Sequence, residues 1–510
     1  MPVAAALYVV IAALIVAGAP AASVSLLVAG LALVVALAVV TGVREVWSAV
    51  DALPAFEERW DAAPRAWLRR NFTATASGGP GAPTRRVRTF DALIEVPAFR
   101  WYMFSQIGNQ SAQLMQMVTR GFLAYHLTGS FAALGAVELA ASIPRLFLAM
   151  YGGVVADRSS RRIIVQVGQV CNAILAVILA GFYFAGQLRF EHLVIGALLQ
   201  GVMNSFVMPA RQSMIPGIVG RDRLMNAYAL NQFGMNMLRL GAPALAGAMI
   251  AAVGAGWVYA LMAFLFLFGL VALFRVPKMD AMSREAPAAS DGLAPLAEDT
   301  LRRRGPDRGG LRAMREAFVY MRGQPVLQIL LFIHVVVGIL ALPYQRLLPG
   351  FVDTVLSGGD PAATARLMGA LLSFTAVGAL TGSLLIASLP SRGRGKLLIA
   401  SLAIFSVGLL AFAASGAFWI SAFIVMVLGL GQAGRQSLVQ ILIQSNVSDE
   451  YRGRVSSILV LEDGIESIGI FMIALVAQAF GPQLALAGVA VTLAFVAGAM
   501  WLTPTIRELP

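Results

Sequence analysis

The chain has 510 residues, of which 59% are hydrophobic and 13% are charged, and its mean hydropathy is +0.78. A soluble domain has about a quarter of its residues charged. The composition therefore argues against a soluble enzyme, a disordered scaffold and a nucleic-acid-binding module, and it predicts a membrane protein. The single cysteine, Cys171, lies in an apolar run, which excludes a disulfide framework and a cysteine-based metal site.

The N-terminal region contains two apolar runs, residues 3–18 and 24–43, separated by a Gly-Ala-Pro turn. No basic residue precedes the first run, so a transmembrane hairpin over 1–43 fits better than a cleaved secretory signal. A single uncleaved anchor is the alternative. Residues 44–88 mix tryptophans with charges and then become rich in Gly, Pro and Ser, which indicates a cytoplasmic or interfacial segment and a flexible linker.

Long apolar runs recur from residue 98 onward, and each is long enough to cross about 30 Å of hydrocarbon as a helix. Continuous runs of this length exclude a strand barrel. The expected spans are 98–125, 131–155, 163–185, 192–214, 224–252, 256–275, 326–348, 366–389, 396–414, 418–443, 455–480 and 483–503. The sequence thus predicts an all-α integral membrane protein with six-helix bundles over 89–278 and 325–510, joined by a cytoplasmic linker over 279–324.

The net charge of +12 is distributed unevenly along the chain. Most of the 38 lysine and arginine residues lie in alternate connecting segments, namely 44–100, 158–162, 221–223, 275–322, 392–396, 452–454 and 507. The segments between them, such as 126–130 and 186–191, hold almost none. The positive-inside rule places the basic segments, and with them both termini, in the cytoplasm. The positions of the basic residues therefore indicate the membrane topology of the chain, and we expect no nucleic-acid partner.

The segment after the second core span has glycines, an acid and a run of arginines. It contains Gly153, Asp157, Arg158, Arg161 and Arg162, in the pattern Gly-x-x-x-Asp-Arg-x-x-Arg-Arg. Glycines let helix ends approach closely, and a helix N-terminus stabilises a neighbouring carboxylate. In this position between spans two and three, the pattern resembles the signature loop of the major facilitator superfamily. The resemblance implies that these five residues form a gating loop.

Further stretches resemble the branch of that superfamily that contains enterobactin exporters and macrolide-efflux permeases. They are Pro209–Gln212, Arg221–Ala227, Arg239–Gly247 and Arg452–Ser457, and the resemblance covers roughly residues 90–505. It implies a twelve-helix permease of two bundles that works by alternating access. The stretch Gly241–Gly247 is similar to the antiporter signature associated with export, with Gly-Ala-Pro where the family more often has Gly-Pro.

Two departures from the family pattern concern the coupling of transport. The second-half loop Ser388–Lys396 keeps its basic residues but has lost the Asp. The fourth span has Ala197 and Leu198 in the region where many proton antiporters carry an arginine before Gly201. Both departures mean that a proton-coupling scheme does not transfer directly from the family.

Nine charged residues fall inside the expected spans: Arg120, Glu138, Arg145, Arg211, Arg239, Arg435, Glu462, Asp463 and Glu466. A charge at the bilayer centre costs at least about 2.5–3.5 kcal/mol, so these side chains should face protein or water. Arg120 and Arg211 have the alternative of lying near helix ends and extending to the interface. Arg239 has the alternative of bracing two helices. Arg120 lies at a depth similar to that of Glu138, which makes the two plausible partners.

A polar stripe follows one face of the first core span. Its members are spaced 3, 4, 3 and 4 residues apart and are Gln106, Asn109, Gln113, Gln116 and Arg120. The stripe runs about 21 Å along the helix. Two environments suit such a stripe, a set of polar helix–helix bonds or a water-filled cavity, and the family resemblance favours the cavity.

Three acids, Glu462, Asp463 and Glu466, lie within five residues of the eleventh core span. Glu462 and Glu466 share a helix face, whereas Asp463 is turned away by about 100°. They cannot all remain ionised and unpaired in a membrane, so either arginines such as Arg435 and Arg145 neutralise them or at least one retains a proton. We interpret this cluster as the proton-coupling element.

Taken together, these features predict a secondary active transporter of the inner membrane that exports a small organic molecule by proton antiport. The alternatives are a dedicated siderophore or lipid exporter and a transport-dead scaffold or receptor on a permease fold. An enzyme is not expected, because the three histidines are scattered and no HExxH, Gly-x-Ser-x-Gly or Walker motif occurs. The predicted partners are a small-molecule substrate and membrane lipid, without a metal or other cofactor. We expect a monomer whose N-terminal hairpin contacts another membrane protein.

Overall fold

The computed structural model describes residues 91–220, 223–277, 324–341, 343–388, 393–447 and 462–507. Helices account for nearly all of these residues, and no strand occurs among them. The predicted hairpin at 1–43, the segment 44–88 and nearly all of the linker 279–324 lie outside the described residues.

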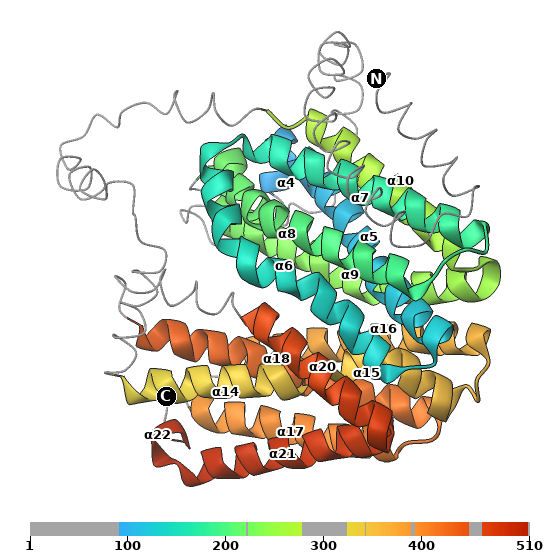
Figure 1. The fold of residues 1–510 in the computed structure, drawn as a ribbon. Helices are drawn as coiled ribbons and strands as arrows, with labels where there is room; N and C mark the ends of the chain where they lie inside the picture. The colour runs from blue at the N-terminus through green and yellow to red at the C-terminus, as the bar shows by residue number, and fades with distance from the viewer. Residues whose placement is uncertain are drawn as a thin grey trace, which may run out of the picture.

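The first half of the described chain forms one bundle of helices (Figure 1). Its elements are α4 (Asp91–Glu95), α5 (Pro97–Thr128), α6 (Phe131–Arg158), α7 (Arg161–Phe184), α8 (Phe190–Val219), α9 (Leu224–Val253) and α10 (Ala255–Phe274). Glycines in the left-handed or extended positive-φ region end α5 and α9, at Gly129 (φ 63°) and Gly254 (φ 92°). Tight turns of this kind hold consecutive helices antiparallel.

The second half forms a second bundle beside the first (Figure 1). Its elements are α14 (Pro325–Ala341), α15 (Pro343–Phe351), the π-helical turn η2 (Val352–Leu356), α16 (Pro361–Ser388), α17 (Arg394–Ala414), α18 (Phe418–Asn446), α20 (Glu462–Phe480), α21 (Pro482–Leu502) and α22 (Pro504–Arg507). All of the expected spans that the described residues cover therefore appear as helices, which confirms the predicted class of fold.

Ten helices of the described chain are long and apolar enough to cross a membrane, and α14, α15 and η2 count as one of these. The two remaining core helices, α5 and α20, are the ones that carry the polar stripe and the three acids. The stripe lowers the hydropathy of α5, and the apolar part of α20 is confined to Glu466–Phe480. Together the twelve make two bundles of six, the fold that the sequence predicts.

The seventh span extends further than the range 326–348 that the sequence predicts. Helix α14 is described to Ala341 and α15 from Pro343, residue 342 lies outside the described residues, and η2 extends the span to Leu356. In η2 the Ser357 amide donates at 2.8 Å to the carbonyl of Val352, five residues earlier, which is the spacing of a π-helix. The next helix then starts at Pro361, five residues earlier than predicted.

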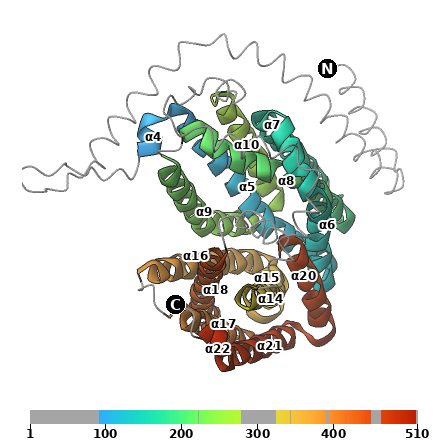
Figure 2. The ribbon, with the colours of Figure 1, turned by 90° about the vertical axis from the view of Figure 1, so that its left-hand side faces the viewer.

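Close backbone contacts hold the helices together, within each bundle and between the two. Inside the bundles, a Cβ placed on Gly201 would lie 2.2 Å from the carbonyl oxygen of Ala141, and one on Gly429 would lie 2.1 Å from that of Thr375. Between the bundles, α9 lies along α16, and α6 lies along α20 (Figure 2). Small residues permit such approaches, as is common between membrane helices.

Candidate functional site

The polar stripe of α5 points into the first bundle. Gln106, Asn109, Gln116 and Arg120 are buried, and Gln113 is half-buried. None of the five is among the residues that line the central cavity described below. The part of α5 that reaches that cavity is apolar, Leu114 and Met117. In this structure Gln106, Gln116 and Arg120 make polar bonds between helices, and a cavity lined by the whole stripe stays a prediction.

One end of the stripe is bonded to Arg211 on α8. The Nη1 group of Arg211 donates to Oε1 of Gln106 at 2.8 Å, and the Tyr102 hydroxyl donates to the Arg211 carbonyl at 3.2 Å. Arg211 is 3% exposed and Arg120 is 7% exposed. Neither side chain extends to a membrane interface, so that alternative is wrong for both. Arg211 instead joins α5 to α8.

The other end of the stripe belongs to a buried ion-pair network. Arg120 donates to Oε1 of Glu138 on α6 at 2.9 Å and to Oε1 of Gln200 on α8 at 3.0 Å. Gln200 in turn donates to Oε1 of Gln116. The predicted partnership of Arg120 and Glu138 is thus confirmed. It satisfies both charges inside the bundle, where an unpaired charge is costly.

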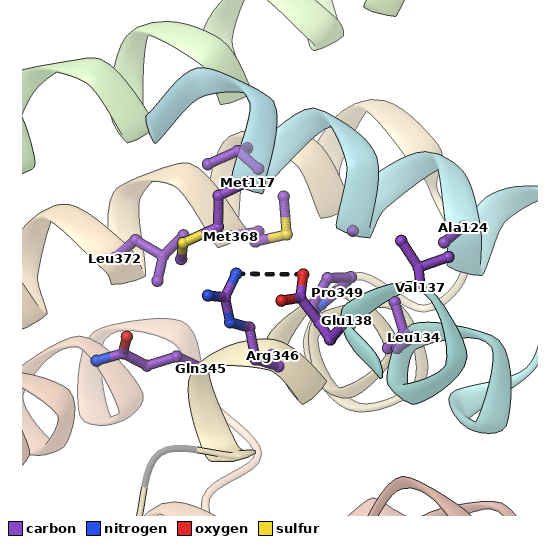
Figure 3. Close-up of a pocket in the computed structure, with 12 residues that line it drawn as sticks. Met117, Ala124, Leu134, Val137, Glu138, Gln345, Arg346, Pro349, Met368 and Leu372 are labelled. Carbon is purple, nitrogen blue, oxygen red and sulfur yellow. Dashed lines mark hydrogen bonds and ion pairs between the residues drawn. The ribbon is translucent and has the colours of Figure 1, made fainter. Parts of the chain in front are cut away.

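A second guanidinium, which the sequence interpretation missed, reaches the same carboxylate from the other bundle. Nη1 of Arg346 on α15 lies 3.3 Å from Oε1 of Glu138 (Figure 3). Arg346 falls near the end of the predicted span 326–348, where an arginine is ordinarily taken to extend to the interface. The sequence around Arg346 holds no signal of a different role.

A cavity of about 680 Å³ lies between the two bundles. Helices from both halves contribute to it: α5, α9, α15, α16, α18 and α20. Its polar lining, in the described part of the chain, consists mostly of amides and hydroxyls with three charged groups: Gln232, Asn236, Arg239, Gln345, Arg346, Thr375, Ser383, Gln432, Gln436, Ser437, Gln440 and Glu466. A concave site with convergent polar groups is the usual form of a small-molecule site.

The cavity is closed at one end of the molecule, here called the loop end, which carries the turns at Gly129, Gly254 and Gly481. There Oε1 of Gln478 on α20 accepts hydrogen bonds from the Phe131 amide at 2.7 Å and from the Ser130 hydroxyl at 3.0 Å. A Cβ placed on Gly350 would lie 2.4 Å from the Phe131 ring. These contacts join the two bundles directly.

The opposite end, here called the linker end, carries Ser159–Ser160, Arg223 and Pro325. The lining residues nearest the loop end on α9, α16 and α18 are Pro243, Leu372 and Gln432. Each lies at least about 15 Å from that end at 1.5 Å per residue. The Glu138–Arg346 pair lies between the cavity and the loop end, beside a void of about 20 Å³, which is room for one water. The cavity therefore spans the middle of the molecule and ends well short of the loop end.

The predicted pathway residues separate into two groups. Arg239 and Glu466 line the cavity. Arg435 is 1% exposed inside the second bundle, and Arg145 donates to Oγ of Ser142 at 2.7 Å and to the Ala141 carbonyl at 3.3 Å. The side chains of Glu462 and Asp463, which begin α20, lie outside the described residues, so their role stays a prediction.

In the predicted gating loop, the two arginines at the start of α7 are described. Arg161 donates to the Ser213 carbonyl at 3.0 Å, and Arg162 donates to the Phe274 carbonyl at 2.8 Å and to the Val276 carbonyl. They therefore tie α7 to α8 and to the end of α10 within one bundle. The surroundings of the side chains of Asp157 and Arg158, and of Gly153, lie outside the described residues.

Comparisons with known proteins agree with this architecture. A family model described as transmembrane secretion effector matches residues 92–509. The staphyloferrin A transporter of Staphylococcus aureus is 22% identical over 359 residues, which cover 68% of this chain and 81% of the relative.

Solved structures of transporters have the same fold. The nucleoside transporter NupG has a TM-score of 0.60 at 17% identity and covers 80% of this chain and 99% of its own. A D-xylose-proton symporter has a TM-score of 0.57 at 13% identity and covers 83% of this chain and 98% of its own. The chain is thus a multi-pass membrane transporter and not an enzyme, and it belongs to the transmembrane secretion effector family of the major facilitator superfamily.

Proposed function

We propose that this transporter exports a small organic molecule across the cytoplasmic membrane in exchange for protons. The observation that carries the proposal is the cavity between the bundles, which is closed at the loop end and has Glu466 on its wall. Such a cavity offers one polar site that two bundles, by rocking, expose to one side of the membrane at a time.

The proposed direction of transport rests on the distribution of charged residues along the chain. The positive-inside rule places the linker end, with its arginine-rich segments, in the cytoplasm. The state described here is then closed on the side away from the cytoplasm, ready to collect a substrate made in the cell. The partial match of Gly241–Gly247 to the antiporter signature supports export as well.

The coupling element of the proposal is Glu466, with Glu462 one turn earlier on the same helix face. A carboxylate on the wall of a cavity can be protonated from one side of the membrane and deprotonated from the other as the bundles rock. Intramembrane acids are expensive and commonly mark ion pathways. Arg239, which lines the same cavity from the other bundle, adds a charge that a bound substrate would redistribute.

The test is flux in proteoliposomes with and without a pH gradient, in wild type, Glu466→Gln and the double variant Glu462→Gln/Glu466→Gln. We expect the double variant to lose the dependence on the gradient and to keep downhill exchange. Glu95→Gln is the matched control, because Glu95 is an exposed acid on α4 paired with Arg223. Gradient-driven transport by the double variant at the wild-type rate would contradict the assigned coupling. Absence of any flux in the folded wild type would favour a scaffold or receptor.

A dedicated exporter of one substrate is the second candidate. The similarity to the staphyloferrin A transporter favours it, since that relative is named for a single compound. The two candidates differ in selectivity, so competition flux with a panel of unrelated organic compounds separates them. A broad exporter is inhibited by many members of the panel, and a dedicated one by close analogues of its substrate.

A further inference from the structure

Among the described residues that face the central cavity, cationic side chains outnumber anionic ones. Two guanidinium groups, Arg239 on α9 and Arg346 on α15, line it together with one carboxylate, Glu466 on α20. The two arginines come from opposite bundles. A ligand held between them would therefore contact both halves of the protein.

The contact with Glu138 does not occupy the whole guanidinium group of Arg346. Its partner Glu138 already receives a bond from Arg120 at 2.9 Å, shorter than the 3.3 Å contact to Arg346, and both arginines reach the same oxygen. The side chain of Arg346 is 26% exposed, against 9% for Arg120 and 10% for Glu138. Figure 3 shows the Arg346 guanidinium between Glu138 and the methionines of α5 and α16. A guanidinium has five N–H donors, so a single contact leaves Arg346 with donors for a ligand.

Arg239 has no ion-pair partner among the described residues, and its side chain is exposed to the cavity that it lines. A cation in this position, within a membrane-spanning helix, carries a desolvation cost, and no carboxylate of the described residues offsets it by an ion pair. An anionic ligand group would offset that cost.

The rest of the polar lining in the described part of the chain is neutral and rich in amides. Six side chains of this kind face the cavity: Gln232, Asn236, Gln345, Gln432, Gln436 and Gln440. Gln345 and Gln432 already bridge α15 and α18 at 3.1 Å. Each amide offers donors and an acceptor, so the lining suits a ligand with many oxygen atoms and not an apolar one.

We infer that the central cavity binds an oxygen-rich organic anion through a carboxylate on Arg346 and a second anionic group on Arg239. This inference rests on the proposed function and specifies its substrate class. Arginine holds a carboxylate through two parallel bonds, and a ligand in that position competes with Glu138 for Arg346. Glu138 keeps Arg120, so its charge remains paired while Arg346 turns to the ligand.

The test compares a rigid tricarboxylate, benzene-1,3,5-tricarboxylate, with its uncharged tris(hydroxyethyl)amide. The dissociation constants are measured on the full chain in nanodiscs by equilibrium dialysis. We expect the tricarboxylate to bind at least about tenfold tighter than the amide, because charge-assisted hydrogen bonds to arginine contribute most of its affinity. Arg346→Gln and Arg239→Gln should each weaken the tricarboxylate by about tenfold. Arg366→Gln, an exposed arginine of α16 away from the cavity lining, should leave it unchanged.

The variant Glu138→Gln distinguishes a ligand site at Arg346 from a purely structural role of this arginine. If Glu138 competes for Arg346, its neutralisation should tighten tricarboxylate binding several-fold, whereas general damage to the fold would weaken it. Arg346→Lys keeps the charge and loses the paired geometry, so it should bind with intermediate affinity. Folding of each variant is checked by size-exclusion chromatography.

Equal affinity for the two probes, absence of binding by either, or wild-type affinity in Arg346→Gln would overturn the inference. These outcomes are distinct from a failure of the proposed function. Proton-driven export of an uncharged compound by a protein that binds no anion would contradict the anion site alone. Anion binding with the expected variant pattern, but without any effect of a pH gradient on flux, would contradict proton coupling alone.

Discussion

Glu138 and Arg346 join the two bundles by an ion pair of 3.3 Å, between α6 of the first half and α15, in the seventh span, of the second. Glu138 is also bonded to Arg120 inside its own bundle. One carboxylate therefore serves an internal contact and an interbundle contact. When the bundles separate at the loop end, only the interbundle contact has to break, and the charge of Glu138 stays compensated.

Removal of Arg120 should destabilise the protein markedly. Arg120→Met deprives the buried Glu138 of its nearer partner and leaves Gln200 without its donor, and breaking a buried pair costs about 3 kcal/mol or more. The matched control is Arg223→Met at the exposed pair with Glu95, which should cost about 1 kcal/mol or less. Thermal unfolding in detergent measures both. Equal stability losses in the two variants would contradict the view that burial sets the value of the Arg120 pair.

A methyl group at Gly369 should disrupt the contact between the bundles. A Cβ there would lie 2.5 Å from the Pro243 carbonyl oxygen on α9, so Gly369→Ala must push the two helices apart. Gly488→Ala on α21 is the control, since no atom lies within 4 Å of the added group. We expect Gly369→Ala to lose most of its flux and Gly488→Ala to keep it, with up to about 1 kcal/mol gained from helix propensity. Flux in proteoliposomes, normalised to folded protein, measures the difference.

Loss of the Gln478 acceptor should open the loop end more often. Gln478→Leu leaves the Phe131 amide and the Ser130 hydroxyl without their partner in the other bundle. The readout is labelling of a single cysteine at Val137, beside the Glu138–Arg346 pair, by an impermeant maleimide in a Cys171→Ser background. Labelling should be several-fold faster than in the parent protein. The exposed Gln187→Leu should leave the rate unchanged, and an unchanged rate in Gln478→Leu would show that this contact does not hold the loop end closed.

The gating-loop prediction concerns Asp157. By its resemblance to the family motif, it braces the ends of the bundles in one conformation, so Asp157→Asn should reduce flux by about tenfold or more while substrate binding persists. Flux and equilibrium binding on the same preparation separate the two effects. Normal flux in Asp157→Asn would mean that the role of this loop in the family does not apply to this chain.

The sequence was informative where one helix determines the outcome. Apolar runs located the spans, and the equal depth of Arg120 and Glu138 identified their pairing. It was less informative about contacts between helices. Periodicity placed the stripe of α5 on one face, but it did not indicate which neighbouring helix that face contacts. Arg346 was missed because its role depends on a carboxylate 208 residues away, on a helix of the other bundle. The amides of the cavity wall carry no charge signal and could not be distinguished from ordinary helix surface.

The seam between α9 and α16 also restricts how this protein can evolve. A Cβ on Gly247 would lie 2.3 Å from the Ala365 carbonyl oxygen and 3.1 Å from the Cα of Gly369. In most packed interfaces a gain of volume on one side is accommodated by a loss on the other. Here both facing positions are already glycine, so neither has volume to give up. Substitutions at these two sites have no compensating partner, and adaptation to new substrates must proceed through the cavity wall while the seam stays fixed.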